Sequence, residues 1–176
     1  KITEDQIGDV ISELTLTNGG TYTRDVQALG TEPMKVTIVW TDVPGTPVGA
    51  QLDPINPMLV NDLDLRLTHG GSTHYPWKLN RNSPASGATN TGENNVDNVE
   101  VVYIANPVAG TYTITVDHDG SITNGTQAFS MIISGINHQE PPTADFMASP
   151  TMVAIGETVT FTDQSANNPT SWTWSF

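Results

Sequence analysis

The sequence contains no cysteine, and only 14% of its 176 residues are charged. Without cysteine the chain can form no disulfide, thiolate zinc site, iron–sulfur cluster or cysteine nucleophile. Lys and Arg together number 6 against 19 Asp and Glu, which gives a formal net charge of −13. Nucleic acid is therefore not an expected partner, because phosphate contacts require clustered positive charge. No apolar run approaches the ~20 residues of a membrane-spanning helix, so we expect no membrane span.

The residues that are abundant favour strands over helices. The chain has 25 Thr, 15 Gly and 12 Pro, and threonine suits a strand better than a helix. Clusters of Gly, Pro and Asn separate short runs in which apolar and polar residues alternate, as in 62–68, where three leucines alternate with Asp62, Asp64 and Arg66. We predict an all-β domain over 1–137, an antiparallel β-sandwich or jelly roll. Its expected strands are 12–17, 34–41, 62–68, 99–104, 110–116 and 128–133.

A second unit is expected after a linker at 138–142. The pair Pro141-Pro142 cannot donate to a strand ladder and keeps the chain extended. Strands are predicted at 144–149, 158–163 and 171–176, with Trp172 and Trp174 on one buried face. Because roughly 35 residues are too few to bury a core without cross-links, we interpret 143–176 as a truncated second domain.

Several runs together resemble a known family. They are WTD at 40–42, LVNDLDL at 59–65, YPW at 75–77, NNVDNVE at 94–100 and GTYT at 110–113. In this order they are similar to the β-sandwich, distantly like a P domain, that follows the catalytic domain in many secreted bacterial subtilisin-like serine proteases. Residues 142–176 resemble the front half of a PKD-type immunoglobulin-like domain, a common extracellular spacer, and this resemblance implies a truncated immunoglobulin-like segment at 143–176. The resemblance implies a secreted or cell-surface protein whose parent is a serine endopeptidase.

No catalytic site is expected in this chain itself. It has no Gly-x-Ser-x-Gly elbow and none of the segments that carry a subtilisin triad. Three of the four histidines are interpreted as solvated turn residues: His69 and His74 flank Gly70-Gly71, and His118 lies in a predicted tight turn at 117–120. His138 falls in the linker. A pair of acids at glycosidase spacing would mean little among 19 acidic residues.

Oxygen ligands are concentrated in two segments, which leads to a calcium hypothesis. Asp62 and Asp64 lie on one face of a strand, about 7 Å apart, and the run that follows the 83–92 loop supplies Glu93, Asn95 and Asp97. Calcium binds six to eight oxygens from carboxylates, amides, carbonyls and water. The family resemblance implies calcium sites of this kind, and the spacing permits one.

Alternatives remain open for the same residues. The two strand aspartates could form an ordinary solvated face with Arg66 as the counter-ion, while Asn94, Asn95 and Asn98 cap turns. Some relatives have an Asp where this chain has Thr91, which removes one expected ligand. Asp42 is either a further ligand or a turn residue, and the 117–120 segment lacks the bidentate acid of a calcium loop.

Two aromatic residues support a competing function. Tyr75 and Trp77 flank Pro76, and an exposed coplanar pair would stack on sugar rings as in a carbohydrate-binding module; the alternative is that they pack over the open edge of the sandwich. A third hypothesis is an adhesin-like spacer. The preferred hypothesis is a non-catalytic accessory domain that acts with the catalytic domain of the same parent chain, and protein or polysaccharide substrates are further candidate partners.

Overall fold

The computed structural model describes residues 10–52, 54–137, 143–166 and 171–175. It divides the chain into two compact units, Lys1–His138 and Gln139–Phe176. The linker predicted at 138–142, which includes His138, lies outside the described residues. None of the residues described belongs to a helix long and apolar enough to cross a membrane.

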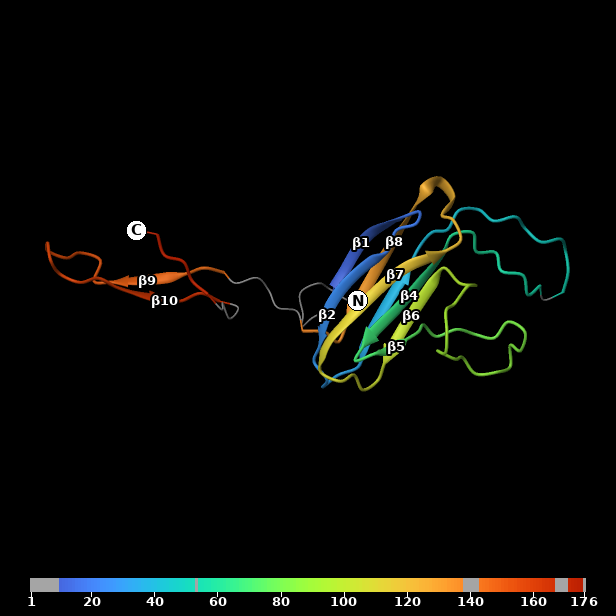
Figure 1. Ribbon diagram of the computed structural model, residues 1–176, viewed down its shortest axis with the longest axis horizontal. Coiled ribbons are helices and arrows are strands. Elements are labelled where there is room, and N and C mark those ends of the chain that lie inside the picture. The colour runs from blue at the N-terminus through green and yellow to red at the C-terminus, as the bar shows by residue number, and fades with distance from the viewer. Residues whose placement is uncertain (1–9, 53, 138–142, 167–170, 176) are drawn as a thin grey trace. The chain divides into compact units, whose positions relative to one another are not determined.

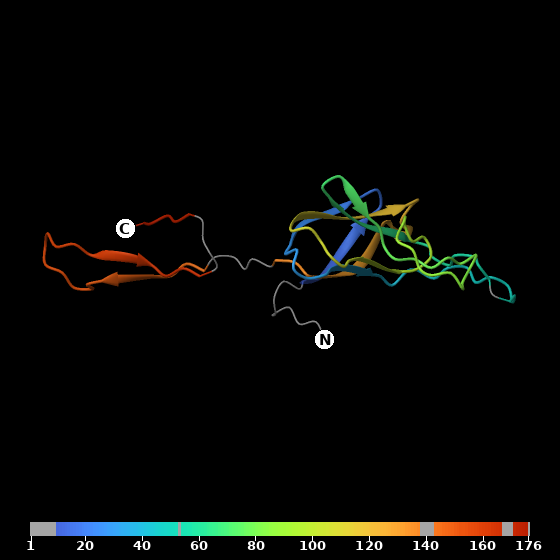
Figure 2. The same cartoon turned by 90° about the horizontal axis from the view of Figure 1, so that it is seen from below.

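The first unit is built from two four-stranded antiparallel sheets (Figures 1 and 2). Sheet A holds, in spatial order, β1 (Val10–Thr17), β8 (Thr126–Ser134), β3 (Met34–Val39) and β6 (Val99–Ile104). Sheet B holds β2 (Tyr22–Ala28), β7 (Gly110–Asp119), β4 (Asp62–His69) and β5 (Ser72–His74). Two sheets of order 1-8-3-6 and 2-7-4-5 have the eight-stranded jelly-roll topology. The predicted all-β sandwich is therefore confirmed.

The core lies between the sheets, on the faces that the period-two pattern selects. Three consecutive inward positions of each central strand are fully buried or nearly so. They are Met34, Val36 and Ile38 of β3, Leu63, Leu65 and Leu67 of β4, Tyr112, Ile114 and Val116 of β7, and Phe129, Met131 and Ile133 of β8. Successive side chains of a strand point to opposite faces, so this alternation fixes which residues face outward.

Some details of the strands differ from the sequence-based expectation. Strands β2 and β5 were not predicted, and β7 continues through Asp119, so the predicted tight turn at 117–120 is wrong over its first three residues. The 3-10 turn η1 (Thr123–Gly125) then precedes β8.

The second unit contains an antiparallel pair, β9 (Phe146–Ser149) and β10 (Thr160–Asp163). The third predicted strand is wrong in its described part, since 171–175 is not strand. Instead the ring of Trp174 lies 5.6 Å from that of Phe146 and 6.0 Å from that of Phe161, measured between centroids. Trp172 is half exposed rather than buried.

Candidate metal centre

Four aspartates of β4 and β7 meet on the outer face of sheet B. The strand register places Asp62 opposite Asp119 and Asp64 opposite Asp117. Residues directly opposite in an antiparallel pair have Cβ atoms about 4.5–5.5 Å apart, and like charges in such positions repel. The fold therefore gathers negative charge from two strands that are some 50 residues apart in sequence.

The segment that leads into β6 is tied over these aspartates. Arg66 forms an ion pair with Asp117, and its Nη1 lies 3.5 Å from Oε1 of Glu93. The Asn95 side chain donates a hydrogen bond to Asp119 Oδ2 at 3.3 Å. One arginine thus serves two carboxylates, and most of the local negative charge has no cationic partner among the described residues.

A sixth acidic side chain reaches this group from the other sheet. Glu100 occupies an inward position of β6 and is completely buried. Its Oε2 accepts a hydrogen bond of 2.6 Å from the backbone N–H of Leu65. That N–H is available because β5 pairs only with the later residues of β4, Leu67 to His69. Glu100 consequently connects the two sheets beside Asp64.

One carboxyl oxygen of each of four acids in this group lacks a hydrogen-bond partner. Oδ1 of Asp62, Oδ1 of Asp64, Oδ1 of Asp117 and Oε1 of Glu100 are all shielded from solvent and accept no hydrogen bond among the described residues. Asp64 is only 2% exposed and Glu100 is 0% exposed. A buried polar atom without a partner costs free energy, and a buried unpaired charge costs more. We define the residues Asp62, Asp64, Glu93 and Glu100 as the acidic centre.

The pKa values of the acidic centre reflect this burial. Burial, with the neighbouring carboxylates Asp62 and Glu93 as the next contributions, raises the pKa of Asp64 to about 7. Burial also raises the pKa of Glu100 to about 9, with Asp64 adding to the effect, and raises that of Asp62. In the absence of a cation, burial thus favours the protonated, neutral forms of Asp62, Asp64 and Glu100.

The acidic centre has the chemistry of a site for a hard cation. Its donors are carboxylate oxygens, with amide oxygens of Asn95 nearby, and calcium accepts such ligands together with backbone carbonyls and water. Within the described part of the chain, no three acidic or histidine side chains already stand at metal-ligand distances from one another. The unpartnered oxygens are of the type that calcium accepts, and a bound ion would have to draw them together.

The structure brings most of the predicted calcium ligands together and leaves one of them apart. Asp62, Asp64 and Glu93 come together, and Asn95 lies beside them through Asp119. Asp97 is exposed and accepts a hydrogen bond from the Asn94 side chain at 3.0 Å. The alternative of a solvated strand face is wrong for Asp64, which is buried, and the ion pairs of Arg66 are with Asp117 and Glu93.

Glu100 was missed by the sequence reasoning, although the sequence contained a signal. It alternates with Val102 and Ile104 on the inward face of β6, so a carboxylate occupies a position that the pattern reserves for an apolar residue. Asp117 was missed because its place opposite Asp64 depends on the pairing of β7 with β4.

Asp42 has a structural position. Its carboxylate accepts hydrogen bonds from the backbone N–H groups of Val43 at 2.8 Å, Val60 at 2.6 Å and Asn61 at 2.9 Å. It therefore ties the start of the long 42–60 connection to its end.

The run YPW, which contains the aromatic residues Tyr75 and Trp77, lies at the edge of sheet A. Pro76 is buried, Tyr75 is half-buried and Trp77 is 43% exposed. The N–H of Trp77 donates to the carbonyl of Val101 in the edge strand β6 at 2.9 Å. Among the described residues no ring contact joins Tyr75 to Trp77, so this stretch covers the strand edge and presents one exposed ring.

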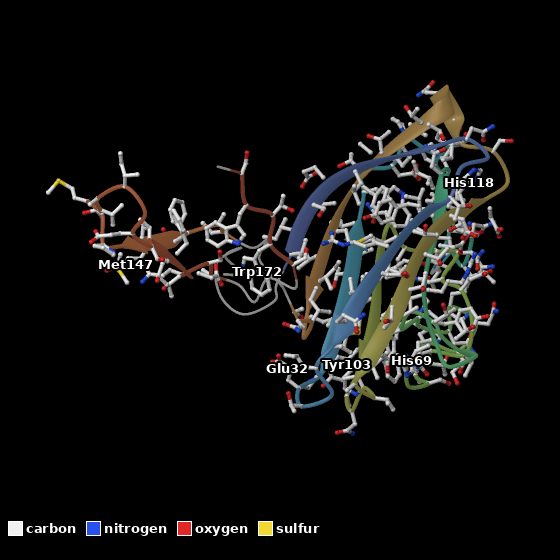
Figure 3. All side chains as sticks on the ribbon, turned by 60° about the vertical axis from the view of Figure 1, so that its left-hand side comes forward. Glu32, His69, Tyr103, His118, Met147 and Trp172 are labelled. Carbon is white, nitrogen blue, oxygen red and sulfur yellow. The ribbon has the colours of Figure 1, made fainter. Side chains whose placement is uncertain are left out.

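The described histidines are not the solvated turn residues that the sequence analysis expected. The His69 ring stacks on Tyr112 at 4.3 Å with a 14° interplanar angle, and burial lowers the pKa of His74, with His69 adding to the effect. His118 accepts a hydrogen bond at Nε2 from the N–H of Gly19 at 2.7 Å. Figure 3 shows His118 and His69 near opposite ends of the sandwich, so they share no site.

No family model matches the chain, and no curated protein matches it either.

Proposed function

We propose that this chain is a non-catalytic accessory module of an exported subtilisin-like serine protease, and that a calcium ion bound at the acidic centre stabilises its sandwich. The observation that carries the calcium part is the set of four buried carboxylate oxygens without hydrogen-bond partners. A divalent cation would pair with these oxygens, allow Asp64 and Glu100 to ionise, and offset the repulsion between neighbouring strands.

The protease part of the proposal rests on the resemblance of the motif runs and of residues 142–176 to protease-associated sandwich and PKD-type domains. In this proposal the partner is the catalytic domain of the same parent chain, the location is extracellular or at the cell surface, and calcium is supplied by that environment. The chain alone is expected to leave a casein substrate intact, which a protease assay of the purified chain tests.

Thermal melts with millimolar calcium and with a chelator test the metal site. We expect calcium to raise the melting temperature of the natural chain, and the double substitution Asp62→Ala/Asp64→Ala to abolish the rise. Asp25→Ala is the matched control, because Asp25 is an exposed acid on the outer face of the same sheet. A calcium response that survives the double substitution, or none in the natural chain, would contradict the proposal.

The exposure of Trp77 favours one second candidate, a polysaccharide-binding module. That function predicts retardation of the chain in a gel that contains a soluble polysaccharide, and loss of the retardation in Trp77→Ala. If neither calcium nor polysaccharide is bound, the spacer hypothesis becomes the preferred one.

A further inference from the structure

The outer face of sheet A is nearly uncharged. Its central row consists of Ile11, Ile132, Thr37 and Val101, which the register places side by side across β1, β8, β3 and β6. The flanking rows contribute Val39, Val99 and Tyr103, which are 36%, 43% and 41% exposed. Contiguous apolar surface of this kind marks interaction sites on soluble proteins.

Glu13 and Lys35 are the two charged residues among the outward positions of these four strands. Glu13 is held in place because the Ser130 hydroxyl bonds to both of its carboxylate oxygens, at 2.8 and 2.9 Å. Lys35 is exposed, lies between Ser134 and Tyr103, and pairs with no carboxylate among the described residues. The face is therefore neutral, although the whole chain carries −13.

The positions of the two charges suit a two-fold axis. Glu13 and Lys35 are two strands and four residues apart, or about 16 Å at standard sheet spacings. Ile132 lies midway, one strand and two residues from each. A line drawn in the plane of the sheet through Ile132, at a right angle to the line that joins Glu13 and Lys35, also passes through Val99. Val99 lies two strands and two residues from Ile132.

We propose that this face binds the same face of a second copy of the chain, with the two-fold axis along the Ile132–Val99 line. Rotation about that axis places Glu13 of each copy over Lys35 of the other, so two equivalent ion pairs flank an apolar spine. Strands of the two copies then cross at a large angle, close to the orthogonal class of sheet packing. An isologous contact of this type closes on itself.

Charge selects a second copy as the occupant. Two chains of net charge −13 repel one another over most approaches, whereas this face presents equal and complementary charges to its own image. The footprint is about 19 Å by 17 Å at standard spacings, smaller than the roughly 800 Å² per partner of stable complexes. We therefore expect a weak dimer, with a dissociation constant on the order of 10⁻⁴ M.

Sedimentation equilibrium of the full chain, from about 10 μM to about 1 mM, measures this association. Glu13→Lys or Lys35→Glu alone replaces both ion pairs with repulsions and should weaken the dimer at least about tenfold. The double exchange Glu13→Lys/Lys35→Glu should restore it to within about threefold. Ile132→Asp sets two carboxylates together on the axis and should abolish it.

Asp25→Lys is the matched control, because it changes the net charge from −13 to −11 as Glu13→Lys does, but on the outer face of sheet B. Circular dichroism verifies that each variant is folded. A natural chain that stays monomeric throughout overturns the proposal, as does equal weakening by Asp25→Lys and Glu13→Lys. Dimers that persist in Ile132→Asp overturn it too, since they would use another surface such as the aromatic cluster of the second unit. These outcomes do not depend on calcium binding, and the proposal stands apart from the proposed function.

Discussion

Replacing Glu100 by glutamine separates the structural role of this residue from its proposed role toward a cation. Burial raises the pKa of Glu100 to about 9, so in the metal-free chain at neutral pH the side chain carries a proton. Glutamine is also neutral and has nearly the same shape, and its oxygen can accept the hydrogen bond that the N–H of Leu65 now donates. The unfolded natural chain releases this proton at neutral pH, whereas glutamine has none to release, so Glu100→Gln should raise the metal-free melting temperature rather than lower it.

With calcium the same substitution should have a large effect. A unit charge pair at about 4 Å contributes about 4 kcal/mol at an effective dielectric constant near 20. The amide oxygen recovers part of this as a neutral ligand, so we expect roughly a hundredfold loss of affinity, or about 2.7 kcal/mol. At calcium a hundredfold above the natural dissociation constant, binding stabilises the natural chain by about 2.7 kcal/mol and the variant by about 0.4 kcal/mol.

Differential scanning calorimetry with calcium and with chelator measures both quantities. At about 3 °C per kcal/mol, calcium should raise the melting temperature of the natural chain by about 8 °C and that of Glu100→Gln by about 1 °C. Glu32→Gln is the control, since Glu32 is exposed and should keep the full rise. A full calcium response in Glu100→Gln would refute the placement of Glu100 in the cation site, and strong metal-free destabilisation at neutral pH would refute its protonated state.

Three further predictions concern pH and the backbone. Between pH 4.5, the ordinary pKa of Glu100, and about pH 9, its pKa in the fold, the folded chain in chelator holds a proton that the unfolded chain has released. The free energy of unfolding should therefore fall as the pH rises through this range, and it should fall less in Glu100→Gln. Equal melting curves at pH 4.5 and at about pH 9 would contradict this. Asp42→Ala deprives three backbone N–H groups of their acceptor and should cost about 1–3 kcal/mol in chemical denaturation without changing the calcium response. Gly135→Ala should lower the free energy of unfolding by about 3 kcal/mol, because the added Cβ would lie 2.1 Å from the carbonyl oxygen of Pro33 at a φ of +76°. Gly19→Ala is the control, since Gly19 has a similar φ of +74° and open space around it, and its loss should be clearly smaller. Equal losses would show that the contact with Pro33 is unimportant.

The sequence pattern predicted most of the sandwich because its central strands bury one face each. In β4 the alternation of leucine with Asp62, Asp64 and Arg66 assigned each side chain to the correct face. Strand β2, with the sequence YTRDVQA, escaped prediction because charged residues interrupt its alternation, and β5 because three residues are too short to show a period. In the second unit one predicted strand was wrong, because the alternating residues at 171–175 form no strand. The ring of Trp174 packs against the rings of Phe146 and Phe161 in the β9–β10 pair instead.

The candidate site was predictable where its residues share one strand or fall in an acid-rich run, as Glu93 does. Asp62 and Asp64 are two residues apart, so their common face follows from the strand period alone. Asp117 and Asp119 reach them through the register of β7 on β4, and Glu100 through the packing of sheet A on sheet B. Such long-range pairings are properties of the topology, and no local pattern encodes them.

Three of the sequence runs meet at one end of the sandwich, namely WTD at 40–42, LVNDLDL at 59–65 and NNVDNVE at 94–100. The indole N–H of Trp40 donates to the carbonyl of Asn61 at 3.0 Å, and the Asn98 side chain donates to the carbonyl of Trp40 at 2.6 Å. Asn61 donates in turn to Gln127 at 2.8 Å, while Asp42 binds the backbone N–H of Asn61. These contacts tie the 42–60 and 75–98 connections to the sheets beside the acidic centre, where few apolar anchors are available. These residues therefore account for how the long loops are held, and a cation at the acidic centre would strengthen the same anchoring.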